Sequence, residues 1–469
     1  MTRLLFAALA AMMTELSANG APATEPARRP NILFILIDDM GYGDLSCFGG
    51  QRVQTPAMDR LAGEGLRFTQ FYVNAPICSP SRVAFTTGQY PNRWGITSYL
   101  DKRQMNRQRG IADWLAPEAP SLARFLSSAG YYTAHVGKWH MGGQRDVGDA
   151  PAITAYGFAT SLTSFEGLGE RVLPVFEPHP DGRKFDHEPT RMSAALGGGP
   201  IHWIERHKVT AYYVDRALEE MKAAETRGQP FYINLWLDDV HSPAQAPPGL
   251  RGDDSPAANY LGVVKEMDRQ LERVFDFVRS RPALRDHTII LLASDNGPEP
   301  GLGVTGGLRG AKGNLYEGGI RLPLIVWSAQ VARSAVGSKN DQTVLAGMDV
   351  VPSMLTLAGV RPPEAVAFDG LDMSGALLGQ EQPQRGKPIM WVRPPDRPGP
   401  KNNWPDLAIR DGNWKLLVFR DGSRPELFDI AADPNETTNL AEKHAEIVQR
   451  LSKAVIAWDK SLPVRAKTK

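Results

Sequence analysis

The sequence has little cysteine: of its 469 residues only Cys47 and Cys78 carry a thiol. A framework of several disulfides, the usual support of a small secreted domain, is therefore excluded. The sequence also lacks an excess of either charge, because 53 Lys and Arg residues stand against 52 Asp and Glu residues. This balance argues against the basic surface with which proteins bind nucleic acids or anionic membranes, so we expect no nucleic-acid partner.

Long hydrophobic runs are also missing. Arg3 precedes an apolar run from Leu4 to Met13, and small residues follow it. The run is shorter than the roughly 20 residues of a membrane span, and its order is typical of a secretory signal peptide, which we assign to residues 1–24. The alternative is an ordinary buried helix. No later run reaches about 18 apolar residues, so we expect no stable membrane insertion. The signal peptide and the scarcity of cysteine together predict an exported bacterial protein, periplasmic or secreted.

Four short apolar runs each end in polar residues. Asn31 to Ile37 is apolar on both faces, as a central strand of a parallel sheet must be. The four run ends are Asp38-Asp39 after Ile37, Gly137 to His140 after Tyr132–Val136, Asp238 to His241 after Phe231–Leu237, and Asp295-Asn296 after Thr288–Ser294. Because ligands of parallel sheets gather beyond the carboxyl ends of the strands, we expect these clusters to share one edge.

Helical patterns separate the apolar runs. Apolar residues recur every three or four positions from Tyr260 to Val278, and similar helices are predicted over Ser121–Ala129 and Thr210–Ala224. Strands that alternate with helices predict an α/β fold, in which helices sandwich a mostly parallel sheet. We expect this catalytic domain to occupy residues 25–380.

The pattern changes after about residue 380. Ile389–Val392, Ala408–Ile409 and Trp414–Phe419 read as a short antiparallel sheet, with a turn at Asp411-Gly412. Ala441–Trp458 reads as a closing helix. Residues 381–469 are therefore predicted to form a smaller C-terminal subdomain.

Two pairs of hard oxygen ligands stand at predicted strand ends. Asp38 and Asp39 repel each other unless a cation or a proton intervenes, and Asp295-Asn296 forms a second pair. Together they suit calcium or magnesium. Two exposed turns that use Asp and Asn as caps are the alternative.

The segment from Cys78 to Arg82 is the most specific local feature. From residue chemistry alone, Cys78 is a small buried hydrophobic residue or half of a disulfide with Cys47. The segment nevertheless matches the Cys-x-Pro-x-Arg signature of the type I sulfatases, in which the cysteine is oxidised enzymatically to formylglycine.

The chain resembles this family from Pro30 to about Leu440. The matching segments occur in the family's order, which makes chance an inadequate explanation. They are Asn31 to Asp44, Thr55 to Leu61, Cys78 to Arg82 with Thr87-Gly88, Gly137 to His140, His241, Ser294 to Gly297, and Arg309 to Arg321.

The resemblance implies an alkaline-phosphatase-like α/β fold and a sulfuric ester hydrolase. It implies one calcium ion bound by a shared set of oxygen ligands. These ligands are Asp38, Asp39, Asp295, Asn296 and the modified Cys78. The maturation enzyme that generates formylglycine is the implied protein partner.

The same resemblance supplies expected catalytic roles. Arg82, Lys138 and Lys312 would balance and orient the formylglycine hydrate and the sulfate. Lysines and a divalent cation favour the transition state, because negative charge moves to the equatorial and leaving oxygens of the sulfate. His241 would act as general acid for the leaving alcohol, and His140 as base for the second hydroxyl of the hydrate.

The substrate is less determined than the chemistry, because substrate choice resides in loops. The resemblance favours 6-sulfate or 4-sulfate esters of galactose or N-acetylgalactosamine. The alternatives are an arylsulfatase, a phosphoester or phosphonate hydrolase of the same superfamily, and a non-catalytic binding protein. Residues 142–207 are read either as a substrate pocket or as a surface loop. The resemblance also implies one further hydroxyl or amide near the sulfate, and either Ser161 or Ser164 could match that position. The polar and aromatic residues that stand out in this stretch are His179, Asp186, His187, Arg191, His202 and Trp203.

Overall fold

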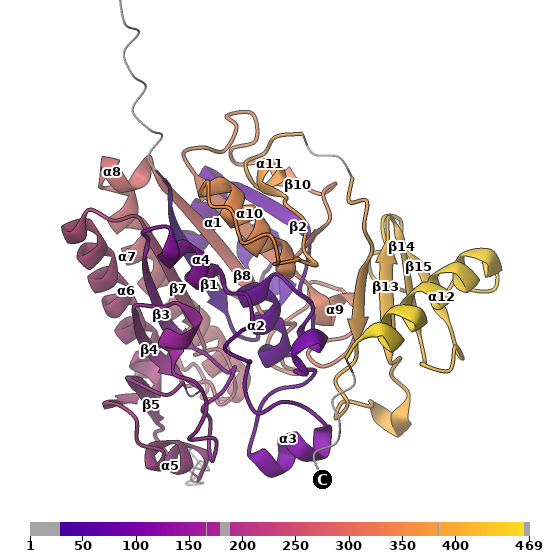
Figure 1. Ribbon diagram of the computed structural model, residues 1–469, viewed down its shortest axis with the longest axis horizontal. Helices are drawn as coiled ribbons and strands as arrows, with labels where there is room; N and C mark the ends of the chain where they lie inside the picture. The colour runs from indigo at the N-terminus through magenta and orange to yellow at the C-terminus, as the bar shows by residue number, and fades with distance from the viewer. Residues whose placement is uncertain (1–28, 166, 179–187, 382–383, 464–469) are drawn as a thin grey trace, which may run out of the picture.

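The computed structural model describes residues 29–165, 167–178, 188–381 and 384–463 (Figure 1). The expected signal peptide lies outside these residues. Among the helices of the described ranges, none combines the length and the apolar character that a membrane crossing requires.

The described residues form two sheets, of which the larger has eleven strands, and its central strands are parallel. From one edge to the other, the order is β10 (Lys339–Asn340), β2 (Leu66–Tyr72), β9 (Arg321–Ser328), β8 (Thr288–Ser294), β1 (Asn31–Ile37), β7 (Phe231–Leu237), β3 (Tyr132–Lys138), β4 (Thr160–Ser164), β5 (Arg171–Val175) and β6 (Ile201–Glu205), and β11 (Leu345–Ala346) pairs with β2. Among the strands of this sheet in the described part of the chain, only β9 runs antiparallel to its neighbours, β2 and β8. The prediction of a mostly parallel sheet is confirmed, and the four strands on which it rested are β1, β3, β7 and β8.

Helices cover both faces of this sheet (Figure 1). Successive side chains of β1 point to opposite faces, so Leu33 and Ile35 pack in one core while Ile32 and Phe34 pack in the other. The first core includes α1 (Pro56–Glu64), α6 (Val209–Arg227) and α7 (Pro256–Arg279), and the second includes α2 (Cys78–Thr87), α4 (Leu122–Ser128) and α10 (Val350–Leu357). The shorter helices are α3 (Arg103–Arg109), α5 (Glu188–Ala195), α8 (Pro282–Arg285), α9 (Glu317–Ile320) and α11 (Ser374–Leu377).

The second sheet is antiparallel and four-stranded, in the order β12 (Ile389–Val392), β13 (Leu407–Asp411), β14 (Trp414–Val418) and β15 (Glu426–Asp429). One face, with Trp391, Leu417 and Phe428, packs into the core of the larger sheet. The other face packs on Leu451 and Val455 of α12 (Ala445–Ser461). The predicted antiparallel sheet and closing helix are therefore present, and the sheet has one strand more than the pattern indicated.

Candidate active site

The four polar strand ends meet at one edge of the larger sheet. Strands β8, β1, β7 and β3 are neighbours and run parallel, so their carboxyl ends lie side by side. Helix α2 begins with Cys78, and Lys312 precedes α9. Two residues of the edge have a left-handed backbone, Asp39 with φ of 57° and His140 with φ of 53°. Such strained conformations cluster at functional sites, where neighbouring structure maintains them.

Three carboxylates form the centre of the site. One oxygen each of Asp38, Asp39 and Asp295 lies within 4.8 Å of the other two, and all three side chains are buried. The Asp39 backbone N–H donates to Asp295 Oδ1 over 3.2 Å, and the Asn296 amide donates to Asp39 Oδ1 over 2.6 Å. The protein thus holds four oxygen-bearing side chains in one compact group.

Three cations surround these carboxylates. Arg82 donates to Asp295 Oδ2 over 2.7 Å, Lys138 pairs with Asp38, and Lys312 Nζ lies 2.5 Å from Asp39 Oδ2. Burial alone raises the pKa of Asp38, but Lys138 and the other nearby cations bring it well below its ordinary value. The pKa of Asp295 is raised to about 7 by burial and by the charge of Asp38. Three adjacent carboxylates are thus costly to ionise together, and cations relieve that cost.

The donor set fits a hard divalent cation. Asp38 Oδ1 and Asn296 Oδ1 are buried and have no hydrogen-bond partner in the described part of the chain. Carboxylate and amide oxygens are the ligands that calcium and magnesium prefer. Asp38, Asp39, Asp295 and Asn296 could therefore hold such an ion.

Cys78 lies beside this group with its thiol buried. Its Sγ lies within 4.8 Å of ligand atoms of Asp38 and His241, and its side chain takes no part in a disulfide. The alternative of a bond to Cys47 is therefore wrong, since Cys47 is also free. Burial raises the pKa of the Cys78 thiol to about 12 despite Lys138 nearby, so the unmodified residue is a protonated thiol and a poor nucleophile.

The two expected catalytic histidines are neutral, and their hydrogen bonds assign their tautomers. His140 Nε2 lies 3.0 Å from the Leu100 carbonyl and must donate to it, which leaves the buried Nδ1 as an unpartnered acceptor. His241 Nδ1 donates to the Ser242 carbonyl over 2.7 Å, so Nε2 faces the site, 3.7 Å from Asp39 Oδ2. Burial lowers both pKa values, and Lys312 and Lys138 help to bring that of His241 to about 4.

Phe165 is a site residue that the sequence analysis missed. Its ring centre lies 5.3 Å from that of His140 and 5.2 Å from that of His241. The Lys138 ammonium lies 4.1 Å from the same ring, within the range of a cation–π interaction. Phe165 directly follows β4, so recognition of that strand from its sequence would have identified it.

The site opens into a cavity of about 310 Å³. Besides Cys78, Lys312 and the two histidines, its lining includes seven residues that the sequence analysis did not single out: Ile77, Tyr99, Arg145, Phe165, Ser242, Glu299 and Arg397. They come from segments far apart in the sequence, and all of them except Ile77 are polar, charged or aromatic. The cavity can therefore present both hydrogen-bonding and stacking groups to a ligand.

A second cavity, of about 420 Å³, adjoins the first at Phe165 and His241, and much of its lining is apolar. Most of its wall comes from residues 142–207, including Leu173 and Phe176, so this stretch contributes to a pocket. Of the His, Asp, Arg and Trp residues that the sequence analysis singled out in this stretch, those that the structure describes do not line the second cavity. His202 pairs with Glu170 at 2.9 Å, and 52% of the surface of Trp203 is exposed. Arg191 is also exposed, and His179, Asp186 and His187 lie outside the described residues.

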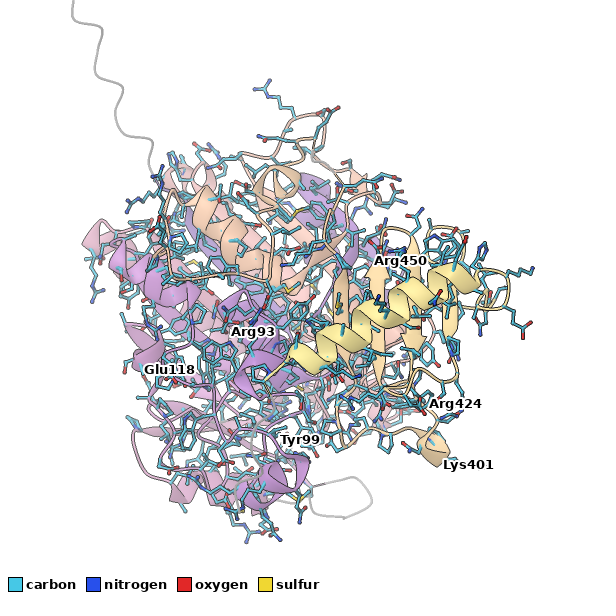
Figure 2. The ribbon with its side chains drawn as sticks, turned by 45° about the vertical axis from the view of Figure 1, so that its right-hand side comes forward. Arg93, Tyr99, Glu118, Lys401, Arg424 and Arg450 are labelled. Atoms are coloured by element: carbon cyan, nitrogen blue, oxygen red, sulfur yellow. The ribbon has the colours of Figure 1, made fainter. Side chains whose placement is uncertain are left out.

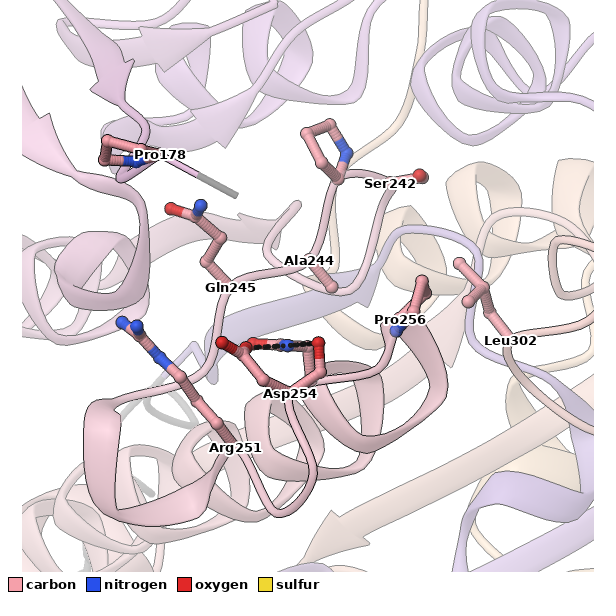
Figure 3. Close-up of a pocket in the computed structure, with 10 residues that line it drawn as sticks. Pro178, Ser242, Ala244, Gln245, Arg251, Asp254, Pro256 and Leu302 are labelled. Atoms are coloured by element: carbon pink, nitrogen blue, oxygen red, sulfur yellow. Dashed lines mark hydrogen bonds between the residues drawn. The ribbon is translucent and has the colours of Figure 1, made fainter. Parts of the chain in front are cut away.

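Ser161 and Ser164, the two candidates for a further contact to the sulfate, lie in different parts of β4. Ser164 ends β4 and donates to Asp238 over 3.1 Å in the wall of the second cavity, whereas Ser161 lies earlier in the strand. Ser242 and Pro243 line the second cavity and a third one, of about 240 Å³ (Figure 3). In that view, Gln245 and Arg251 lie on the side opposite Leu302. The cavities thus continue outward from Cys78 along the loop after β7.

Comparisons with known proteins agree with this architecture. Residues 30–360 match the sulfatase family model, and residues 311–461 match the model described as N-sulphoglucosamine sulphohydrolase, C-terminal. The chain is 30% identical to N-acetylgalactosamine-6-sulfatase of Canis lupus familiaris over 393 residues, covering 81% of this chain and 72% of the relative.

Two bacterial proteins extend the comparison. N-acetylgalactosamine-6-O-sulfatase of Bacteroides thetaiotaomicron is 28% identical, over 91% of this chain and 92% of its own. The crystal structure of Ps i-CgsB superposes with a TM-score of 0.77 at 25% identity, covering 94% of each chain. The chain belongs to the sulfatase family, and it is a sulfuric ester hydrolase.

Proposed function

We propose that this enzyme releases sulfate from a sulfated carbohydrate, with a 6-sulfate or 4-sulfate ester of galactose or N-acetylgalactosamine as the substrate class. The observation that carries the proposal is the buried group of three cations and three carboxylates around Cys78. The two relatives named above, which act on N-acetylgalactosamine 6-sulfate according to their names, support the choice of sugar.

We infer that Cys78 acts as formylglycine, made by a maturation enzyme that recognises the segment from Cys78 to Arg82. The raised pKa of the unmodified thiol supports this inference, because a protonated thiol is a poor nucleophile. The hydrated aldehyde would supply the hydroxyl that attacks sulfur. A hydrate also has a second hydroxyl, whose deprotonation expels sulfate and restores the aldehyde.

We propose calcium as the resident cation, held by Asp38, Asp39, Asp295, Asn296 and modified Cys78. When bound, it would supply positive charge next to the nucleophile. Lys138 and Lys312, which now face carboxylates, would turn their ammonium groups to the equatorial sulfate oxygens. Arg82 would stay on Asp295 and hold that carboxylate in place.

The histidine tautomers support separate roles. The free Nδ1 of His140 can accept a proton from the second hydroxyl of the hydrate, because Nε2 is occupied by the Leu100 carbonyl. His241 must be protonated at Nε2 to serve as general acid. The lysine charges oppose that protonation, and the negative charge of a bound sulfate ester offsets them.

An arylsulfatase is the second candidate. The apolar cavity of about 420 Å³ beside His241 supports it, because this histidine faces the leaving alcohol in the proposed mechanism. An aromatic alcohol would bury its ring against Phe165 and Leu173.

The deciding experiment measures sulfate release from a panel of sulfated sugars and an aryl sulfate, with formylglycine at position 78 confirmed by peptide mass. Release from one sugar position, well above release from the aryl ester, supports the carbohydrate sulfatase. The reverse order supports the arylsulfatase, and faster hydrolysis of a phosphate monoester by protein that retains the Cys78 thiol would favour a phosphoester hydrolase. Cys78→Ala is the matched inactive control.

We also propose the domain organisation and location expected from the sequence. Residues 1–24 would be removed on export to the periplasm or the medium, residues 25–380 would form the catalytic domain, and residues 381–469 the C-terminal subdomain. Mass analysis of the mature N-terminus after expression in a Gram-negative host tests the cleavage.

A further inference from the structure

Arg397 reaches the catalytic cavity from the C-terminal sheet. It lies on the connection between β12 and β13, and it lines the same cavity as Cys78 and Lys312. Its side chain packs against Gly313, where an added Cβ would lie 3.2 Å from Arg397 Cδ. Its guanidinium carbon lies 5.3 Å from the ring centre of Tyr99, the residue labelled near α3 in Figure 2. Arg397 is therefore held next to Lys312 by stacking and by backbone contact.

The arginines near Arg397 already have acidic partners. Arg109 Nε lies 3.1 Å from Asp396, and Arg145 Nε lies 3.0 Å from Asp101. Across the described ranges, no carboxylate comes within ion-pair distance of Arg397. The Arg397 guanidinium is held in one orientation, is partly buried and has no acidic partner among the described residues, so it is available to bind an anion. Its planar arrangement of N–H donors matches the oxygens of a carboxylate or a sulfate.

We propose that Arg397 binds a second anionic group of the substrate, so that the preferred ester is a sugar with a sulfate or a carboxylate in addition to the sulfate that is released. This inference rests on the proposed carbohydrate substrate and narrows it to polyanionic sugars. The cations at Cys78 bind the reacting sulfate, and Arg397 binds the other charge at the cavity wall.

Glu299 should weaken the binding of the second anionic group. It lines the same cavity, and its Oε2 atom is buried without a hydrogen-bond partner among the described residues. A carboxylate there repels a second anion and accepts a hydrogen bond from a sugar hydroxyl. Glu299→Gln should therefore strengthen the binding of doubly charged sugars more than that of singly charged ones.

The test measures binding, which does not require turnover. Calorimetry on full-length Cys78→Ala protein with calcium would compare N-acetylgalactosamine 6-sulfate, its 4,6-disulfate, and a 6-sulfated disaccharide that carries glucuronate. We expect at least one doubly charged ligand to bind about tenfold more tightly than the monosulfate. Arg397→Ala added to this background should reduce the preference to less than about twofold.

Arg424→Ala is the matched control, since Arg424 also belongs to the C-terminal sheet region (Figure 2). Like Arg397, it stacks on an aromatic ring: its guanidinium carbon lies 3.8 Å from the ring centre of Phe419. Arg424→Ala should leave the preference unchanged. A preference for only the disulfate or only the uronate identifies the second anion as sulfate or carboxylate. Equal affinities, absence of binding by all three ligands, or a preference that survives Arg397→Ala would overturn the inference.

The same ligands separate this inference from the proposed function. Enzyme with confirmed formylglycine that releases no sulfate from any sugar would contradict the carbohydrate sulfatase. If Arg397 still determines the calorimetric preference in that case, the anion site stands and the hydrolysed substrate is another polyanion.

Discussion

Lys415 donates a hydrogen bond to Glu317 across the junction of the two sheets, and these fully buried side chains lie 2.9 Å apart. Lys415 belongs to β14, whereas Glu317 begins α9, five residues after Lys312. Glu436 completes the group: it lies 2.9 Å from Lys415 and accepts the Glu317 backbone N–H over 2.7 Å. The C-terminal sheet is thereby attached to the segment that carries a cation of the active site.

Lys415→Met should destabilise the protein by about 3–5 kcal/mol, because it removes the buried cation that Glu317 and Glu436 share and leaves Glu317 with the weaker contact to Arg321 at 3.4 Å. Urea unfolding followed by tryptophan fluorescence measures the loss. Lys453→Met on the exposed face of α12 is the control and should change the free energy of unfolding by less than about 0.5 kcal/mol. Equal stability of the two variants would show that the buried group contributes nothing specific.

Phe165→Ala should lower kcat/KM by about tenfold, because it removes the ring that contacts Lys138 and separates the two histidines. Steady-state kinetics with the best substrate of the panel measures the effect. Phe419→Ala removes a comparable cation–π contact, that with Arg424, away from the site. Unchanged kcat/KM in Phe165→Ala would refute a role of this ring in holding the catalytic groups.

The central strands could be predicted from the sequence for a physical reason. Both faces of β1, β7 and β8 are buried, so nearly every residue in them is apolar and the runs match the observed bounds. Strands β4 and β6 lie toward an edge, where half-buried polar residues interrupt the pattern. The antiparallel direction of β9 also has no local signal, because it depends on the path of the chain between β8 and β9.

The residues of the candidate active site also fall into those that the sequence could predict and those that it could not. Asp38, Asp39, Asp295 and Asn296 could be brought together from the sequence, because parallel neighbouring strands place their ends at one edge. Tyr99 and Arg397 could not, because their proximity to Cys78 depends on how loops from different parts of the fold converge. The tautomer of His140 likewise depends on a backbone carbonyl 40 residues away in sequence.

Asp295→Asn should lower calcium affinity by about tenfold or more, since it replaces a charged ligand by a neutral one of the same shape. Calorimetric titration of the metal-free protein with calcium measures the change. Asp286→Asn, on the exposed turn before β8, is the control. Unchanged affinity in Asp295→Asn would place the cation elsewhere and remove the support for the proposed ligand set.

Asp268 should make the folded protein less stable as the pH rises from about 4 to about 6. Its carboxylate lies on α7 and accepts the backbone N–H groups of Ala57 and Met58, at 3.0 and 2.9 Å, at the start of α1. Burial nevertheless raises its pKa from 3.8 to about 6, so the folded protein binds this proton more tightly than the unfolded chain does. The contribution of Asp268 to stability is therefore complete below about pH 4 and is lost as the pH rises to about 6.

Urea unfolding of the wild type and of Asp268→Asn at several pH values between 4 and 7 would test this dependence. The difference between the two proteins isolates Asp268 from the other titrating groups, because asparagine cannot release a proton. We expect the stability of the wild type relative to the variant to decline between pH 4 and 6 and then to level off. A relative stability that rises over the same interval would mean that the hydrogen bonds from α1 outweigh burial and that the carboxylate is ionised in the folded protein.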